Sequence, residues 1–124
     1  TALYAALLGV LFLVLSFRVI AQRRDAKVAV GTGEDRLLLR ASRAHANFAE
    51  YVPIILILMG LAEATGTPRA VVHAIGAATL IGRALHAYGI RQEPEPFIFR
   101  MSGMILTFTA LAVAILAALW GALF

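Results

Sequence analysis

Long apolar segments alternate with short polar connections along the whole chain. Four segments, residues 2–22, 37–64, 68–88 and 97–124, are long and apolar enough to cross a bilayer when helix tilt and snorkelling of charged ends are allowed. A helix satisfies its backbone hydrogen bonds internally, as the hydrocarbon core of a membrane requires. The pattern therefore predicts an all-α integral membrane protein, a bundle of four transmembrane helices that forms a single domain over residues 1–124.

The polar connections indicate how these helices pair. The sequence GTG at residues 31–33 marks a loop before the second helix. Thr67 as N-cap and Pro68 at the first helical position would start the third helix after a short connection, so the second and third helices should be antiparallel neighbours. The sequence RQEPEP at residues 91–96 is too rich in proline to be helical throughout and closes a second hairpin.

Basic residues follow the topology of a membrane protein. Of the 11 Lys and Arg residues, seven lie between residues 18 and 43, three lie between 83 and 100, and only Arg69 lies in the second connection. Cytoplasmic connections carry the excess of positive charge, so we expect the first and third connections inside and both termini outside. Because topology accounts for the net charge of +4, no nucleic-acid partner is expected.

A polar stripe stands at the start of the second helix and consists of Arg36, Arg40, Arg43, Asn47 and Glu50. Spacings of four, three, four and three residues place these side chains on one helix face over about 21 Å. Counting back about 20 residues from the exit near Ala64 puts the hydrocarbon boundary near His45, with Glu50 about 9 Å inside it. A carboxylate at that depth must be paired or neutralised.

Two interpretations of the polar stripe are open. In the first it only joins helices: Arg43 snorkels, Asn47 bonds to another helix, and Glu50 pairs with an arginine elsewhere in the bundle. In the second it forms one wall of a site, and Arg83 and His86 near the cytoplasmic end of the third helix form the other. Several guanidiniums and one carboxylate would suit an anionic ligand that also carries an ammonium group.

Metal and thiol chemistry of the protein itself are not expected. The three histidines have no close partner at i, i+4, and Glu50 lies on a different helix face from His45, so we predict no metal site. His73 lies off the polar stripe near the opposite end, and we interpret it as an interfacial residue without a chemical role. The chain has no cysteine, so thiol chemistry would need a thiol from a ligand.

The segment RASRAHANFAEYVP at residues 40–53 resembles the signature of the MAPEG family, the membrane-associated proteins of eicosanoid and glutathione metabolism. Its pattern R-x-x-R-A-x-x-N-x-x-E-Y-x-P opens the second membrane helix. AQRRDAK after the first helix, GRALHAYG at the end of the third and Arg100 at the start of the fourth extend the resemblance over essentially the whole chain. The resemblance implies a bacterial-type member in the inner membrane. It would be a homotrimer surrounded by lipid, with glutathione sites at subunit interfaces that an apolar electrophile can reach.

The resemblance also implies roles for individual residues. Glutathione would be bound by Arg23, Arg43, His45, Asn47, Glu50, Tyr51, Arg83, His86 and Tyr88. Arginines would hold its carboxylates and Glu50 its ammonium group, while Arg100 corresponds to the arginine that stabilises the thiolate in the family's synthases. His45 lies about 200° around the helix from Arg43, which suits the site of a neighbouring subunit better.

Two positions depart from the pattern of the family's leukotriene and prostaglandin synthases. Ile90 stands where these synthases carry a tyrosine, and only the offset Tyr88 could substitute for it. Met101 stands where the prostaglandin branch has a serine beside the catalytic arginine, with Ser102 next along the chain. Glutathione binding is therefore better supported than any named reaction.

These observations predict a glutathione-dependent transferase or peroxidase that acts on apolar electrophiles. One alternative is a non-catalytic membrane scaffold that keeps the family fold and binds lipid or another anion, which the missing tyrosine favours. A small multidrug exporter has a similar size, but its mechanism needs a carboxylate in the first membrane helix. No ionisable group other than Tyr4 precedes Arg18 in this chain.

Overall fold

Four long helices make up the computed structural model, which describes all of residues 1–124. They are α1 (Ala2–Ala26), α2 (Arg36–Ala64), α3 (Arg69–Arg91) and α4 (Phe97–Leu123). Each is long and apolar enough to cross a membrane, so the predicted all-helical class and the four spans are confirmed. Two helices run further than predicted, α1 to Ala26 and α3 to Arg91.

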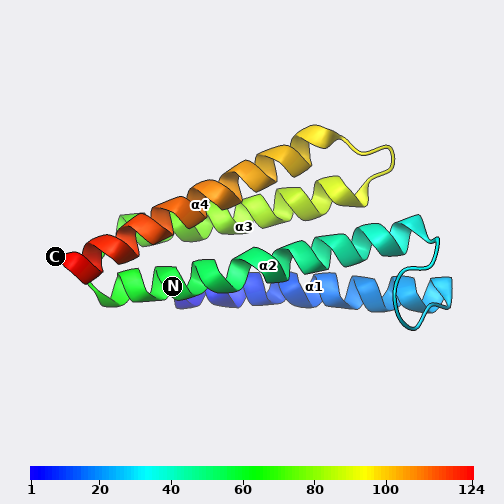
Figure 1. Ribbon diagram of the computed structural model, residues 1–124, viewed down its shortest axis with the longest axis horizontal. Coiled ribbons are helices and arrows are strands. Elements are labelled where there is room, and N and C mark those ends of the chain that lie inside the picture. Colours follow the sequence, from blue (N-terminus) through cyan, green and yellow to red (C-terminus); the bar gives the residue numbers. More distant parts are fainter.

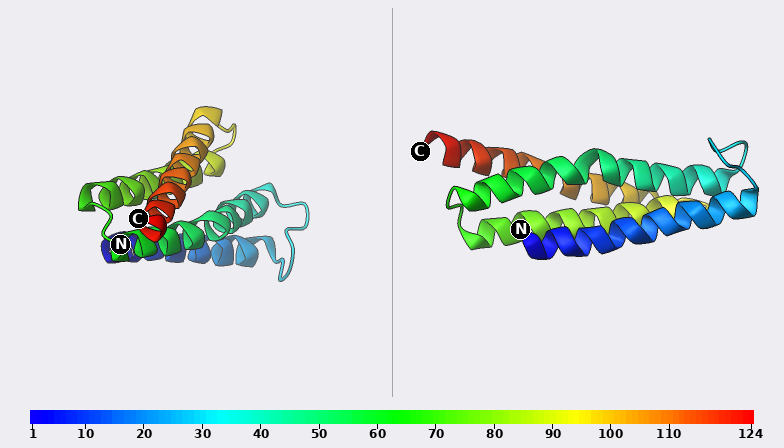
Figure 2. Two further views of the ribbon diagram at one scale, coloured as in Figure 1. Left: turned by 60° about the vertical axis from the view of Figure 1, so that its left-hand side comes forward. Right: turned by 90° about the horizontal axis from the view of Figure 1, so that it is seen from below.

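The helices are arranged as two antiparallel hairpins (Figure 1). Helix α1 lies beside α2, and α3 lies beside α4. Both termini lie at the same end of the bundle as the short connection between α2 and α3, whereas the other two connections lie at the opposite end (Figure 2). Helix α1 contacts α2 and α3 but not α4, so α2 and α3 form the middle of the bundle.

Local sequence sets where the middle helices begin. Asp35 caps α2, since its backbone is extended and its carboxylate accepts a hydrogen bond of 2.7 Å from the amide of Leu38. The predicted start of α3 was wrong by one residue. Pro68 is the N-cap, with an extended ψ of 136°, and its carbonyl accepts the first helical bonds from Val71 and Val72. No side chain caps this end, so Thr67 does not act as the N-cap.

Two glycines allow α3 and α4 to approach closely. A Cβ atom added to Gly82 would lie 2.9 Å from the carbonyl oxygen of Gly103, and one added to Gly103 would lie 2.7 Å from the amide nitrogen of His86. Further along α4, Ala110 and Ala114 are buried. Close packing of small residues is a main source of helix association in lipid, where burial of apolar surface contributes little.

Substituting alanine for Gly103 should therefore separate α3 from α4. We expect Gly103→Ala to destabilise the folded protein by about 1–3 kcal/mol, because the new methyl group meets backbone atoms that cannot yield without moving a helix. Unfolding in detergent, followed by circular dichroism, measures the effect. Gly9→Ala is the matched control, since no atom lies within 4 Å of the added Cβ. Equal stability of the two variants would contradict the close approach.

The arrangement of the connections gives a direct test of topology. Thr32 lies in the connection between α1 and α2, and Thr67 lies in the connection at the other end of the bundle. Cysteines introduced singly at these positions in this cysteine-free chain should react with a membrane-impermeant maleimide from opposite sides. We expect Thr32→Cys to be labelled from the cytoplasm only. Labelling of both from one side would contradict the four-span topology.

Candidate functional site

A buried arginine lies where α2, α3 and α4 meet. Arg83 of α3 is only 2% exposed. Its Nε donates to Thr107 Oγ1 at 2.9 Å, one terminal nitrogen donates to Asn47 Oδ1, and the other lies 3.3 Å from Met104 Sδ and 3.5 Å from the carbonyl oxygen of Gly103. All these acceptors are neutral. The guanidinium is thus satisfied in its hydrogen bonds while its positive charge has no carboxylate partner.

A pocket of about 280 Å³ opens beside this arginine and is lined by Arg43, Asn47, His86, Ile90, Arg100 and Met104. A second pocket of about 250 Å³ is lined by Arg36, Leu39, Arg40, Arg43, Ile90, Glu95 and Arg100. The two adjoin, because three lining residues are common to both. We call them together the cationic pocket, since four arginines and one glutamate supply its charged walls.

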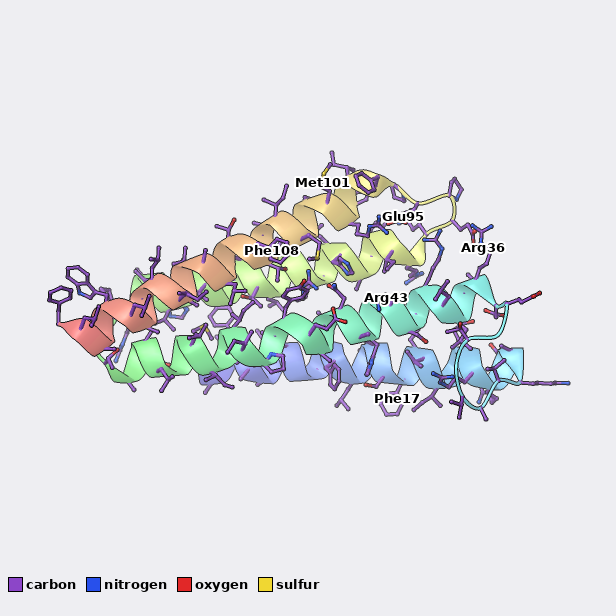
Figure 3. The ribbon with its side chains drawn as sticks, viewed as in Figure 1. Phe17, Arg36, Arg43, Glu95, Met101 and Phe108 are labelled. Atoms are coloured by element: carbon purple, nitrogen blue, oxygen red, sulfur yellow. The ribbon has the colours of Figure 1, made fainter.

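The outer part of the polar stripe binds the connection between α3 and α4. Arg36 pairs with Glu93 at 2.7 Å, and Arg40 pairs with Glu95 at 3.2 Å. Arg40 also donates to the carbonyl oxygen of Ile90 at 3.2 Å. Figure 3 shows Arg36 and Glu95 at the same end of the bundle, with Arg43 further along α2. The first turn of the polar stripe therefore joins α2 to this connection through Arg36 and Arg40, two residues to which the first interpretation gave no role.

Arg100 meets the same connection from the opposite side. Its Nη1 donates to Glu95 Oε2 at 3.3 Å, and its Nε lies 3.1 Å from Oε1. The N–H at Nε is not directed at Oε1, which accepts no hydrogen bond although it is buried. The guanidinium also lies over the ring of Phe97, 5.2 Å from its centre. Glu95 thus connects Arg40 of α2 with Arg100 of α4.

Sequence reasoning missed Glu93 and Glu95. Their signal was present, because two acids two residues apart stand in a connection that the charge distribution places at the same membrane surface as the polar stripe. The prediction for this connection rested on its prolines and gave the two glutamates no role.

The structure brings a central group of the predicted site residues together. Arg43, Asn47, His86 and Arg100 line the cationic pocket, and Arg83 is bonded to Asn47 directly behind it. Tyr51 follows one turn along α2, with its ring centre 5.9 Å from the guanidinium carbon of Arg83. These residues come from α2, α3 and α4, so the second interpretation of the polar stripe has a geometric basis.

Three other predicted residues lie outside this group. Arg23, in the last turn of α1, donates to the carbonyl oxygen of Gly31 in the following connection at 2.6 Å. His45 faces α1, where its Nε2 lies 3.1 Å from Ser16 Oγ and its ring stacks on a phenylalanine. Tyr88 is half exposed and packs edge-on against Phe99 rather than pointing into the cationic pocket. Within one chain, none of the three lines the pocket.

Glu50 lies on the outer surface of α2. It is exposed, and no ion pair joins it to another side chain of the chain. The exposed residues that follow it on the same face are Ile54, Ile57 and Leu61. The carboxylate is thus about one helical turn beyond Asn47, at the point where this face of α2 becomes apolar, and it does not line the cationic pocket.

His73 lies at the end of the bundle away from the cationic pocket. Its Nδ1 is 3.2 Å from the hydroxyl of Tyr4, and the two rings meet edge to face. A third cavity at this end is lined by both of them together with Arg69 and Glu63. The placement agrees with an interfacial residue remote from the polar stripe.

The cationic pocket is suited to anions. Arg43 and Arg100 line both of its parts, Arg83 is bonded to Asn47 behind it, and Glu95 is the only carboxylate in its walls. Guanidiniums bind carboxylates, phosphates and other oxyanions through paired hydrogen bonds. Near the edge of a bilayer these interactions are stronger than in water, because the surrounding dielectric is lower.

The fold and this site define a membrane protein of four helices with an arginine-rich pocket between α2, α3 and α4 at one end. The sequence model of the MAPEG family matches residues 1–120, and the chain belongs to this family. Two relatives, each named inner membrane protein YecN, come from Escherichia coli strain K12 and from strain O6:H1 CFT073. Each is 40% identical over 120 residues, which cover 97% of this chain and 90% of the relative. The resemblance drawn from residues 40–53 is confirmed.

Proposed function

We propose that this protein is a glutathione-dependent transferase or peroxidase that acts on apolar electrophiles dissolved in the membrane. The observation that carries the proposal is the cationic pocket, where Arg43, Arg83 and Arg100 converge with Asn47 and His86 at one end of the helix bundle. Membership of the MAPEG family and the inner-membrane relatives support the same setting, a bacterial inner membrane.

The charges of glutathione match those of the pocket. The tripeptide carries two carboxylates, an ammonium group and a thiol, so the arginines of the pocket would bind the carboxylates. Glu50, about one helical turn along α2 from Asn47, would accept a hydrogen bond from the ammonium group. The polar residues thus serve a zwitterionic ligand better than a simple inorganic anion.

Activation of the thiol is assigned to Arg100. A thiol with a pKa near 8.5 is mostly protonated at neutral pH, and a nearby guanidinium stabilises the thiolate. In the transferase reaction the thiolate sulfur forms a bond to an electrophilic carbon, whose leaving group departs with the bonding electron pair. Arg100 suits this role because its guanidinium lines the pocket and is about a third exposed there.

A homotrimer is part of the proposal, and Glu50 supports it. A charged carboxylate on a lipid-facing helix surface is unfavourable, so this group needs a partner from outside the chain. The apolar face formed by Ile54, Ile57 and Leu61 continues from it along α2 and is available for contact with another subunit. Assembly through this face would place Glu50 at an interface beside the cationic pocket.

Two observations favour a second function. Arg100 is already paired with Glu95, and Ile90 rather than a hydroxyl-bearing side chain lines the pocket. Both fit a non-catalytic family member that binds an anionic ligand or a lipid headgroup without activating a thiol. Binding without turnover would distinguish this alternative.

Replacing Arg100 by leucine should separate activation from binding. We expect Arg100→Leu to retain much of the glutathione binding but to lose thiolate absorbance near neutral pH. With the pKa of the bound thiol raised, transfer should be about ten- to a hundredfold slower at pH 7 and should recover as the pH rises above that pKa. Stopped-flow absorbance and a model electrophile provide both measurements. Arg91→Leu is the control, because Arg91 is exposed at the same end but does not line the pocket. An unchanged rate and thiolate signal in Arg100→Leu would exclude Arg100 as the activating group.

Replacing Glu50 by glutamine should weaken binding itself. The amide keeps the size of the side chain but removes the charge, so glutathione affinity should fall about ten- to a hundredfold, the equivalent of about 1.5–3 kcal/mol. Calorimetric titration in detergent measures this affinity. Glu63→Gln, an exposed glutamate at the other end of the same helix, is the matched control. Both variants should keep the mass of a trimer. Parent-like affinity in Glu50→Gln would make this residue structural and favour the non-catalytic alternative.

A further inference from the structure

Glu95 occupies an unusual place for a residue in a connection between helices. Its carboxylate lies within the cationic pocket between two arginines from different helices, Arg40 of α2 and Arg100 of α4. The distances from Oε2 to the two Nη1 atoms are 3.2 and 3.3 Å. The side chain is 15% exposed, whereas that of Glu93, two residues earlier, is 33% exposed.

The contacts of Glu95 are incomplete for a buried carboxylate. Both hydrogen bonds reach Oε2, and Oε1 accepts none although it lies 3.1 Å from Arg100 Nε. A carboxylate held by two arginines ordinarily forms paired, parallel bonds to each guanidinium. The arginines therefore retain N–H donors that another oxyanion could use, and Glu95 accepts fewer hydrogen bonds than the surrounding donors could supply.

The position of Glu95 in the chain allows its carboxylate to move away from the two arginines. It lies between the end of α3 at Arg91 and the start of α4 at Phe97, so its release disturbs no helical hydrogen bond. Arg40 and Arg100, in contrast, are fixed within helices. An anion that enters the pocket meets two arginines whose backbone is held in helices and a carboxylate on a connecting segment.

We propose that Glu95 is a specificity-determining residue that occupies the place of a ligand's oxyanion group. The carboxylate neutralises Arg40 and Arg100 in the empty pocket. A ligand that brings a carboxylate or similar oxyanion displaces Glu95 and takes its place on Arg40, and the released Arg100 is then free to stabilise the thiolate. The inference rests on the proposed function in taking the ligand to be anionic. It deepens that function by explaining how the site rejects neutral thiols, which cannot compete for the two guanidiniums.

Competition of this kind predicts that removing the charge of Glu95 strengthens anion binding. In Glu95→Gln the neutral amide no longer competes for Arg40 and Arg100, so both sulfate and glutathione should bind about tenfold more tightly than to the parent. Calorimetric titration of the detergent-purified full chain with each probe gives the two affinities. Glu95→Asp, which keeps the charge but withdraws it by one methylene, should give a smaller gain.

Glu93→Gln is the matched control. It removes the same charge from the same connection, but Glu93 pairs with Arg36 and lies 4.0 Å from Arg40 Nε, without contact to Arg100. Its affinities should stay within about twofold of the parent, because exposed ion pairs contribute little. An equal gain in Glu93→Gln would mean that net charge alone acts, which would overturn the proposal.

The two probes separate this inference from the proposed function. Tighter sulfate binding by Glu95→Gln, with no glutathione binding by any variant, would support the role of Glu95 and contradict the glutathione site. Weaker or unchanged binding of both probes would show that Glu95 only positions the arginines, and the inference would be wrong. Absence of sulfate binding to every variant would also overturn it, since freed guanidiniums must then be unavailable to anions.

Discussion

The buried charge of Arg83 is the constraint on which the rest of the structure depends. Removing a guanidinium from water is costly unless its donors find acceptors, and here Asn47 of α2 and Thr107 and Gly103 of α4 supply them. These contacts require α4 to lie close against α3, which Gly82 and Gly103 permit. The packing of three helices and the positive potential of the site therefore have a common origin. No carboxylate pairs with Arg83, so its charge adds to the positive potential of the pocket.

Charge changes in a regular way along the polar stripe of α2. At its outer end Arg36 and Arg40 are paired with acids of the connection between α3 and α4, while Arg43 lines the pocket without an ion pair. Further along α2 the polar stripe continues with the uncharged Asn47, which accepts a hydrogen bond from Arg83. The outer and inner turns of the polar stripe thus make different contacts. The outer turns hold the connection against the bundle, and the inner turns carry one arginine without an ion pair, Arg43, at the pocket.

The outer face of α2 raises a separate physical problem. Glu50 is exposed on a surface that continues as Ile54 and Ile57, within the part of the helix that crosses the membrane. Beside this face, α1 and α2 form an apolar groove of about 260 Å³ that includes the small residues Gly9 and Ala49. Apolar side chains are stable in contact with lipid, but a charged carboxylate is not. Glu50 therefore requires a partner on this face, whereas the apolar side chains around it do not.

Sequence alone determined the number of helices, their order and the face of α2 that carries polar residues, because hydropathy and helical periodicity are local properties. It also identified the family from residues 40–53, which the comparison over residues 1–120 confirms. Tertiary structure decided which polar residues meet. Arg83 reaches Thr107 because glycines bring α3 and α4 together, and it reaches Asn47 because α2 packs against α3. Glu95 reaches Arg40 because the connection between α3 and α4 folds towards α2. Such contacts join residues far apart in the chain, and their geometry depends on helix packing, which no local pattern specifies.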